Sequence, residues 1–291
     1  MLRVGPTLAA SLSMLVWGCG SDPLEQPGAA GGAAGAGGSA PQCDEPQGYA
    51  STHPLQFVGS VDATVRDLDG NAPTDLLVQV CGINKCISGA SDSSGNALVS
   101  VNDDLTRPAF KYGDGLTYGK VALLLAEPSD MVALGTLSTP ALPSSGSPIT
   151  AGAIASSGGA ELTVAPGASI AFDSLTYRTA DEKAFRAAEL PLAQAPAALD
   201  QGLGLELYVA LAPLDTEFCP PATLALANSP GWSPGTPVEF YTHGLDVGEV
   251  YAPYGGFAKF ADGAVSDDGA QIRAQDQTLS VLSLVAVRRR N

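Results

Sequence analysis

The sequence predicts a mostly β protein: two β-sandwich-like domains in tandem, behind a cleaved signal and a flexible linker. Three observations favour this fold class. Glycine and proline are abundant, with 34 and 22 of the 291 residues, which indicates many turns. Only 15% of the residues are charged, which disfavours long solvated helices. The apolar residues, 45% of the chain, fall in short runs between turn residues, as is typical of strands.

The chain begins with a predicted signal peptide. Arg3 precedes an apolar run, Val4–Val16, which is shorter than the ~20 residues of a membrane-spanning helix, so a cleaved signal is favoured. The next residues are Trp17, Gly18 and Cys19, and they resemble the lipobox of bacterial lipoproteins, in which a small residue precedes an invariant cysteine. The resemblance implies cleavage before Cys19 and a diacylglyceryl group on its sulfur. Trp17 departs from the lipobox, which leaves ordinary signal-peptide cleavage as the alternative.

The lipobox resemblance also implies an address. Fatty acyl chains, such as palmitate, on Cys19 would anchor the protein to the membrane, because each buried CH₂ contributes ~0.8 kcal/mol. Gly20 stands where well-studied lipoproteins retained at the inner membrane carry aspartate. We therefore expect a lipid-anchored protein of the cell envelope, with the outer membrane favoured and the body on its periplasmic or surface face.

Changes in composition divide the chain into four segments. From Gly20 the chain is dominated by Gly, Ala, Ser and Pro, and the run Gly28–Gly38 has no charged or large apolar side chain. Such a stretch buries too little surface to offset its ordering entropy, so it is predicted to be a flexible linker. The Ser/Pro/Gly-rich stretch Thr139–Ser147 marks a further boundary. The expected segments are a signal peptide (1–18), a lipidated N-terminus with linker (19–42), a first β-sandwich (43–147) and a second β domain (148–291).

The acidic charge limits the classes of partner. The formal net charge is −16 at pH 7, whereas nucleic-acid binding needs a basic patch that releases counterions from phosphates. Nucleic acid is therefore not an expected partner. The membrane, through the lipid, and an envelope protein or a glycan are the partners that we expect, and no cofactor is predicted.

Four cysteines remain besides Cys19, and an even number in an exported chain suggests two disulfides, for which three connectivities exist. Cys81 and Cys86 flank a four-residue turn between apolar runs, which places them close together across a hairpin. The pairing left over joins Cys43 to Cys219 and would fasten the N-terminal stretch to the distal domain. A metal or redox site is disfavoured because the chain lacks Cys-x-x-Cys spacing and has only two histidines.

The first sandwich is predicted from strands and turns that follow one another from Leu55 to Leu137. The matching elements, in chain order, are Gly59–Val61, Asp67–Pro73, Val78–Val80 and Asp92–Gly95. They resemble the carboxypeptidase-regulatory-like, or transthyretin-like, β-sandwich, with its Gly-x-Val strand, its turn that runs from Asp through Gly to Pro, its Val-x-Val strand and its Asp-x-x-Gly turn. Asp67, Asp69 and Asp92 offer possible calcium ligands, but aspartate that bonds its own backbone at a turn is the favoured interpretation.

The second domain is expected to be a ZU5-like β-module followed by a further β-region. The residues that carry this resemblance are Val164–Gly167, Tyr208, Pro213, Phe218 and Pro221, with Tyr208 and Pro213 one residue wider apart than in the family. Within this domain only Ala180–Ala188 is expected to be helical. The apolar run Leu279–Val287 is expected to form the last core strand, ahead of a solvated basic tail.

No catalytic motif stands out, and we expect a protein that is not an enzyme. The chain lacks Gly-x-Ser-x-Gly, His-Glu-x-x-His and the phosphate-binding Gly-x-x-x-x-Gly-Lys. His53 is expected in an exposed loop and His243 at a strand end. Some relatives of the second module cleave themselves at His-Phe-Ser. Here the nearest triplet is Thr278–Ser280, which lacks the histidine, so no self-cleavage is predicted.

Aromatic residues suggest one candidate binding site. Trp232, Tyr251 and Tyr254 lie in the distal domain, where exposed rings could stack on sugars or on a protein, although filling of the core is the favoured role. Three hypotheses follow. The first is a non-catalytic structural or interaction module, the second is a glycan- or ligand-binding lipoprotein that uses these rings, and the third is a hydrolase with an unrecognised carboxylate site.

Overall fold

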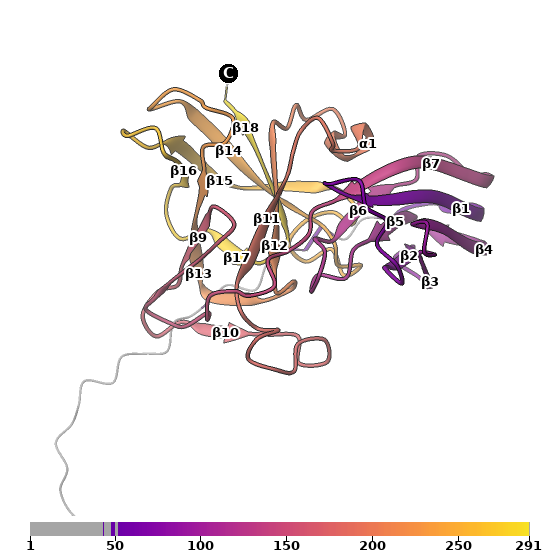
Figure 1. Cartoon of the computed structure of the whole chain (residues 1–291), viewed down its shortest axis with the longest axis horizontal. Coiled ribbons are helices and arrows are strands. Elements are labelled where there is room, and N and C mark those ends of the chain that lie inside the picture. Colours follow the sequence, from indigo (N-terminus) through magenta and orange to yellow (C-terminus); the bar gives the residue numbers. More distant parts are fainter. Residues whose placement is uncertain (1–42, 44–47, 50–51, 291) are drawn as a thin grey trace, which may run out of the picture. The chain divides into compact units, whose positions relative to one another are not determined.

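The computed structural model describes residues 43, 48–49 and 52–290, so the predicted signal peptide, Cys19 and the linker lie outside the described residues. The described residues all fall in one compact unit and form eighteen strands and one four-residue helix (Figure 1). The predicted mostly β fold class is confirmed. None of the described residues belongs to a helix long and apolar enough to cross a membrane.

Two sheets built from residues 55–139 form the first half of the body. Their strands are β1 (Leu55–Asp67), β2 (Leu77–Cys81), β3 (Cys86–Ala90), β4 (Asn96–Thr106), β5 (Ala109–Tyr112), β6 (Val121–Leu124) and β7 (Ser129–Thr139). One sheet has the order β4-β1-β7, with β1 central, and the other has the order β3-β2-β5-β6 (Figure 1). In β1 the buried residues Val61, Ala63 and Val65 alternate with more exposed polar ones, as expected of a strand with one buried face. The inward faces of both sheets share one hydrophobic core.

Two turns in this half share the pattern Asp-x-x-Gly-Asn. The Asp67 carboxylate accepts hydrogen bonds from the backbone N–H groups of Asp69 (3.0 Å) and Asn71 (2.7 Å). The Asp92 carboxylate accepts the same two bonds from Ser94 (2.8 Å) and Asn96 (2.9 Å). These bonds are those of the predicted turns. Among the described residues, no cluster of three or more His, Cys, Asp or Glu side chains is arranged to hold a metal ion.

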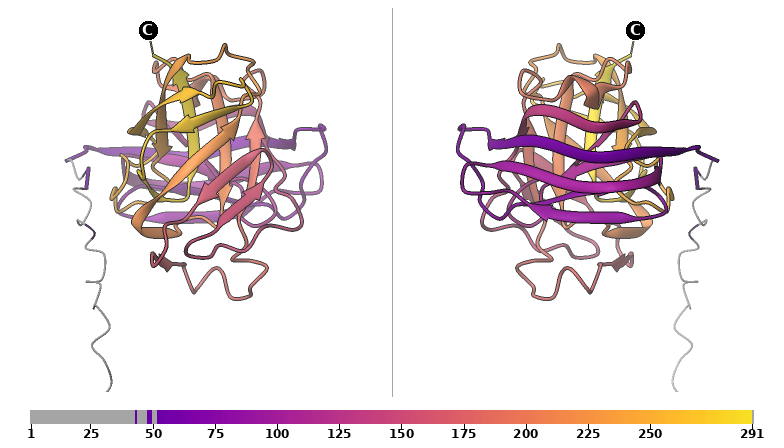
Figure 2. Two further views of the ribbon diagram at one scale, coloured as in Figure 1. Left: turned by 90° about the vertical axis from the view of Figure 1, so that its left-hand side faces the viewer. Right: turned by 90° about the vertical axis from the view of Figure 1, so that its right-hand side faces the viewer.

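The second half is an eleven-stranded sheet that is nearly closed. Its strands are β8 (Ile154–Ser157), β9 (Ala160–Thr163), β10 (Ser169–Ala171), β11 (Arg186–Leu190), β12 (Leu207–Ala212), β13 (Glu217–Ala227), β14 (Pro237–His243), β15 (Phe257–Val265), β16 (Gln271–Ala274), β17 (Leu279–Val281) and β18 (Leu284–Arg289). The order is β11-β12-β18-β14-β15-β16-β13-β9-β8, and β10 and β17 pair with β13 beside this path. Figure 2 shows this half, mainly in orange and yellow, in front in its left view, and the first half, in purple, in front in its right view. The two end strands approach each other, because the Ala187 N–H of β11 donates to the Ser157 hydroxyl of β8 (3.3 Å).

The hydrophobic core of the first half extends into the second. Leu190, Tyr208, Tyr241 and Leu284 belong to the same buried cluster as the sandwich residues, although they follow the expected domain boundary at 147/148. A separate cluster lies inside the eleven-stranded sheet. The two halves therefore bury apolar surface against each other and not only within themselves.

The helix expected at Ala180–Ala188 is wrong. The chain turns there and enters β11 at Arg186, where it pairs with β12, and the neighbouring Phe185 and Ala187 are fully buried. Burial of strand side chains against the sheet outweighs the local helix preference. The helix α1 (Ala197–Asp200) lies further along the chain and ends at Gln201, which has a φ of 51°.

The last strand also differs from the expectation. The run Leu279–Val287 is split into β17, which pairs with β13, and β18, which pairs with β12 and β14. The basic tail is not merely solvated. Arg288 pairs with Glu239 (2.7 Å), and Arg289 pairs with Glu206 (2.6 Å).

Candidate functional site

A pocket of about 240 Å³ opens beside β17, between that strand and the strands β14 and β15. We call it the Tyr251 pocket. Three aromatic rings line it, from Tyr49, Tyr251 and Phe260. Three hydroxyl side chains line it as well, from Thr242 on β14, Thr278 and Ser280. The lining thus combines apolar ring surface with polar groups, which is the usual composition of a small-molecule site.

Two buried hydroxyls in the wall of this pocket have no hydrogen-bond partner. Among the described residues, three buried side-chain polar atoms are unpartnered: Arg186 Nε, Thr242 Oγ1 and Thr278 Oγ1. Both threonines line the Tyr251 pocket, and Thr242 is only 4% exposed. Native proteins pair almost all buried polar groups within the fold, so two hydroxyls in one pocket wall that have no protein partner are an uncommon feature.

The Tyr251 ring is fixed by its hydroxyl. Tyr251 donates a hydrogen bond to the carboxylate of Glu217 on β13, and burial, together with that carboxylate, raises the pKa of the Tyr251 hydroxyl. The ring therefore stays neutral and is held in the pocket wall. A held ring loses little conformational entropy when a ligand packs on it.

Tyr49 reaches the pocket from the N-terminal end of the body. Its N–H donates to the Glu249 carbonyl (2.7 Å), next to the segment that carries Tyr251. Cys43 is joined to Cys219 of β13, with 5.7 Å between the Cα atoms. The disulfide thus ties the stretch that carries Tyr49 to the strand that carries Glu217.

The charge at the lip of the pocket is already neutralised. The Lys259 ammonium donates to Glu239 (2.9 Å) and to Asp262 (2.8 Å). Its bond to Glu239, with those from Tyr241 and Arg288, lowers the pKa of Glu239 to about 2. Lys259 is therefore held by two carboxylates and offers little net charge to a ligand.

Burial separates the three predicted ring residues. Trp232, 9% exposed, packs in the core of the eleven-stranded sheet, and its backbone N–H donates to the side-chain oxygen of Asn228. Tyr254 is fully buried in a third hydrophobic cluster. Neither ring can serve as an exposed platform, so the alternative ligand-binding role is wrong for both, and the favoured role in the core is correct. Tyr251 alone of the three lines the pocket.

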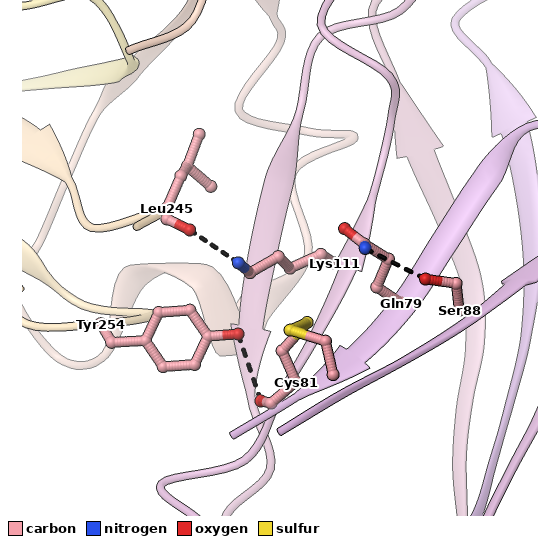
Figure 3. The surroundings of a disulfide bond; sticks show 7 residues. Gln79, Cys81, Ser88, Lys111, Leu245 and Tyr254 are labelled. Atoms are coloured by element: carbon pink, nitrogen blue, oxygen red, sulfur yellow. Dashed lines mark hydrogen bonds between the residues drawn. A yellow bond between two sulfur atoms is a disulfide. The ribbon is translucent and has the colours of Figure 1, made fainter. Parts of the chain in front are cut away.

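A buried polar network joins the two halves and contains Tyr254. We use "buried network" for Lys111, His243, Glu249 and Tyr254. The Tyr254 hydroxyl donates to the Cys81 carbonyl (3.1 Å), and Lys111 donates to the Leu245 carbonyl (2.7 Å) (Figure 3). The Lys111 ammonium also lies 4.7 Å from the centre of the Tyr254 ring. Burial, with a smaller effect of the charge on Lys120, lowers the pKa of Lys111 to about 8.

His243 is held by backbone groups from both halves of the body. Its Nδ1 lies 2.8 Å from the Gly256 carbonyl oxygen, and its Nε2 lies 3.0 Å from the carbonyl oxygen and 3.3 Å from the backbone nitrogen of Ala122. Burial lowers the pKa of His243 to about 4, so the ring is neutral at physiological pH. Glu249, 3% exposed, accepts a hydrogen bond from the Tyr254 N–H (2.9 Å). The expected strand-end position of His243 is correct, but its side chain serves the contact between the halves.

Both cysteine pairs that the sequence favoured are joined. Cys81 and Cys86 face each other across the β2–β3 hairpin, with 4.0 Å between the Cα atoms. Cys43 and Cys219 form the long-range bridge. Cys19, the predicted lipidation site, lies outside the described residues.

The sequence analysis missed Thr242 and Tyr49 as pocket residues. Thr242 follows Phe240 and Tyr241 in a strand that is buried from Phe240 onward. A threonine hydroxyl in such a strand is the feature that could have indicated the site. Whether that hydroxyl has a hydrogen-bond partner, however, depends on tertiary contacts. Thr278 and Ser280 were considered only for self-cleavage. Comparison of the chain with family models, with curated proteins and with solved structures found no match, so both family resemblances stay predictions.

Proposed function

We propose that this protein is a lipid-anchored binding module of the cell envelope, and that it holds a small ligand in the Tyr251 pocket without converting it. The observation that carries this proposal is the pair of unpartnered hydroxyls, Thr242 and Thr278, in one pocket wall. An unpaired buried hydroxyl costs about 1–3 kcal/mol. A ligand that pairs both hydroxyls recovers that free energy on binding.

The engagement of the histidines supports binding over chemistry. Both ring nitrogens of the buried His243 face backbone groups, so neither nitrogen is open to a substrate. His53 lies 3.6 Å from the buried Glu249 carboxylate. Neither histidine lines the Tyr251 pocket, so neither is placed to act there as a general base.

The binding role is tested with the full-length chain and a library of small neutral and charged compounds, monitored by thermal shift and by ligand-observed NMR. The variant Ser280→Phe fills the pocket, and Ser233→Phe places the same ring at an exposed site outside the lining. We expect compounds that bind the unmodified chain and Ser233→Phe but not Ser280→Phe. Compounds that bind all three proteins equally, or no binding at all, would refute the proposal.

We propose the envelope address from the lipobox resemblance at Cys19. Cells fed radiolabelled fatty acid should label the protein, and Cys19→Ala should abolish the label. Protease treatment of whole cells then tells the surface face from the periplasmic face. An unacylated mature N-terminus in mass spectrometry would contradict the lipid anchor while leaving the pocket untouched.

A further inference from the structure

We infer that the ligand of the Tyr251 pocket is a neutral sugar, bound through one pyranose ring. The inference rests on the proposed function and names its ligand class. It is drawn from four properties of the pocket: its volume, its hydroxyls, its rings and its charge.

The volume limits the ligand to one ring. Pockets for drug-sized molecules enclose about 300–1,000 Å³. The Tyr251 pocket encloses about 240 Å³ and lies at the surface, bordered by the half-exposed Tyr49. A single six-membered ring with its substituents fits such a volume, and further units of a chain would extend outside it.

The hydroxyls require a ligand that both donates and accepts. Each threonine hydroxyl has one donor hydrogen and two acceptor lone pairs. Thr242 and Thr278 use none of this capacity within the protein. The adjacent hydroxyls of a sugar ring each donate and accept, so a sugar ring offers the kind of partner that both threonines can bond. A hydrocarbon would leave both unpaired.

The rings require a ligand with an apolar face. Tyr49, Tyr251 and Phe260 present aromatic surface to the pocket. Aromatic side chains contribute large apolar contact area, and the C–H face of a pyranose supplies a matching surface. The hydroxyl of Tyr251 is already bonded to Glu217. The aromatic surface of Tyr251, and not its hydroxyl, is therefore the main contact that this residue offers to a ligand.

The charges favour a neutral ligand. Lys259 is the one charged side chain among the described lining residues, and Glu239 and Asp262 hold it. A phosphate or a uronate would have to compete with two carboxylates for this cation, in a chain of net charge −16. Binding a neutral ring disrupts neither ion pair.

The test is saturation-transfer difference NMR on the full-length chain with methyl glycosides of neutral hexoses and of N-acetylhexosamines. Methyl glucuronide and methyl glucosaminide serve as the charged comparators. We expect saturation of the neutral glycosides and at least tenfold weaker signals from both charged ones. Thr242→Val and Tyr251→Ala should each weaken binding about tenfold, whereas Tyr251→Phe, which keeps the ring and loses only the bond to Glu217, should weaken it less.

A set of uncharged aromatic fragments separates the two proposals. If fragments bind the unmodified chain but not Ser280→Phe, and no sugar binds, the sugar inference is wrong while the proposed binding function stands. Equal or tighter binding of a charged comparator, or sugar binding unchanged in Thr242→Val, would also overturn the ligand class. If neither sugars nor fragments bind, both proposals fail.

Discussion

The buried network and the Tyr251 pocket both place polar side chains inside the body, but they differ in how those side chains are paired. In the buried network His243 is bonded through both ring nitrogens, and Tyr254 and Lys111 each donate to a backbone carbonyl. In the pocket the hydroxyls of Thr242 and Thr278 have no partner. Fully paired polar groups serve the fold, whereas unpaired ones are available to a ligand.

Each region has its own disulfide, and removing the two should have different consequences. The Cys43–Cys219 bridge spans 176 residues of sequence, and the Cys81–Cys86 bridge spans 5. By loss of unfolded-chain entropy, replacing the first pair by serine should lower the free energy of unfolding by about 5 kcal/mol, and replacing the second by about 2 kcal/mol. Urea unfolding under identical conditions measures both.

Only the long bridge should affect ligand binding. It ties the stretch that carries Tyr49 to β13, so its loss frees one ring of the Tyr251 pocket. The Cys81–Cys86 bridge lies beside the buried network, where Tyr254 bonds the Cys81 carbonyl (Figure 3). Equal loss of binding in both double variants would show that the bridge does not position Tyr49.

Two tyrosines three residues apart allow a matched substitution. Tyr254→Ala removes a fully buried ring and should cost about 4 kcal/mol of unfolding free energy. Tyr251→Ala removes a partly exposed ring and should cost about 1 kcal/mol. Ligand binding should show the opposite order of sensitivity once both proteins are compared in their folded state. A larger stability loss for Tyr251→Ala would assign that ring to the core.

His243 should make the body less stable in acid. Its pKa is about 4 in the folded state against about 6.5 in the unfolded chain, so between these values only the unfolded chain takes up the proton. The free energy of unfolding should therefore fall by about 3 kcal/mol as the pH drops from 6.5 to 4.

The control for this titration is His243→Gln, whose amide can still donate and accept but does not titrate. It should be less stable than the unmodified protein at pH 7 and should lose less stability between pH 6.5 and 4. Urea midpoints across this range measure both proteins. Parallel pH curves for the two would assign the acid sensitivity to other groups.

The features that the sequence predicted correctly are those set by local chemistry. The mostly β class follows from short apolar runs between turn residues, and the Asp67 and Asp92 turns follow from bonds that reach no further than four residues. The β2–β3 hairpin and its disulfide follow from a spacing of five residues. Each of these is decided by backbone geometry within a few residues, which a sequence displays directly.

The contact between the halves and the pocket were not predictable in the same way. Trp232, Tyr251 and Tyr254 are all aromatic residues of the distal domain, and the sequence does not distinguish them. Only the tertiary packing decides that Trp232 and Tyr254 are buried. The pocket brings Tyr49 together with Thr242 and Thr278, and both threonines follow Tyr49 by more than a hundred residues in the chain. Whether a threonine hydroxyl finds a partner depends on the neighbouring strand, and a strand's neighbours follow from topology and not from its own residues.

The smallest expected effect is the most direct test of the comparison, because it concerns a single oxygen atom. Thr139, at the end of β7, is fully buried, and its hydroxyl donates to the Gly119 carbonyl (2.9 Å). Thr139→Val should therefore lower the unfolding free energy by about 1 kcal/mol, since it removes a paired donor. Thr242→Val replaces an unpaired hydroxyl by a methyl group in a side chain of similar shape, and it should raise the free energy of unfolding by up to about 1 kcal/mol.

Urea unfolding of the two valine variants beside the unmodified chain gives the sign of each change. Opposite signs would show that the Thr242 hydroxyl contributes nothing to the fold and is retained at a cost in stability. That cost has a physical reason if the hydroxyl binds a ligand, and Thr242→Val should then lose binding while gaining stability. A destabilising Thr242→Val would instead mean that the hydroxyl already has a partner in solution, and Thr242 would belong with the paired groups of the buried network.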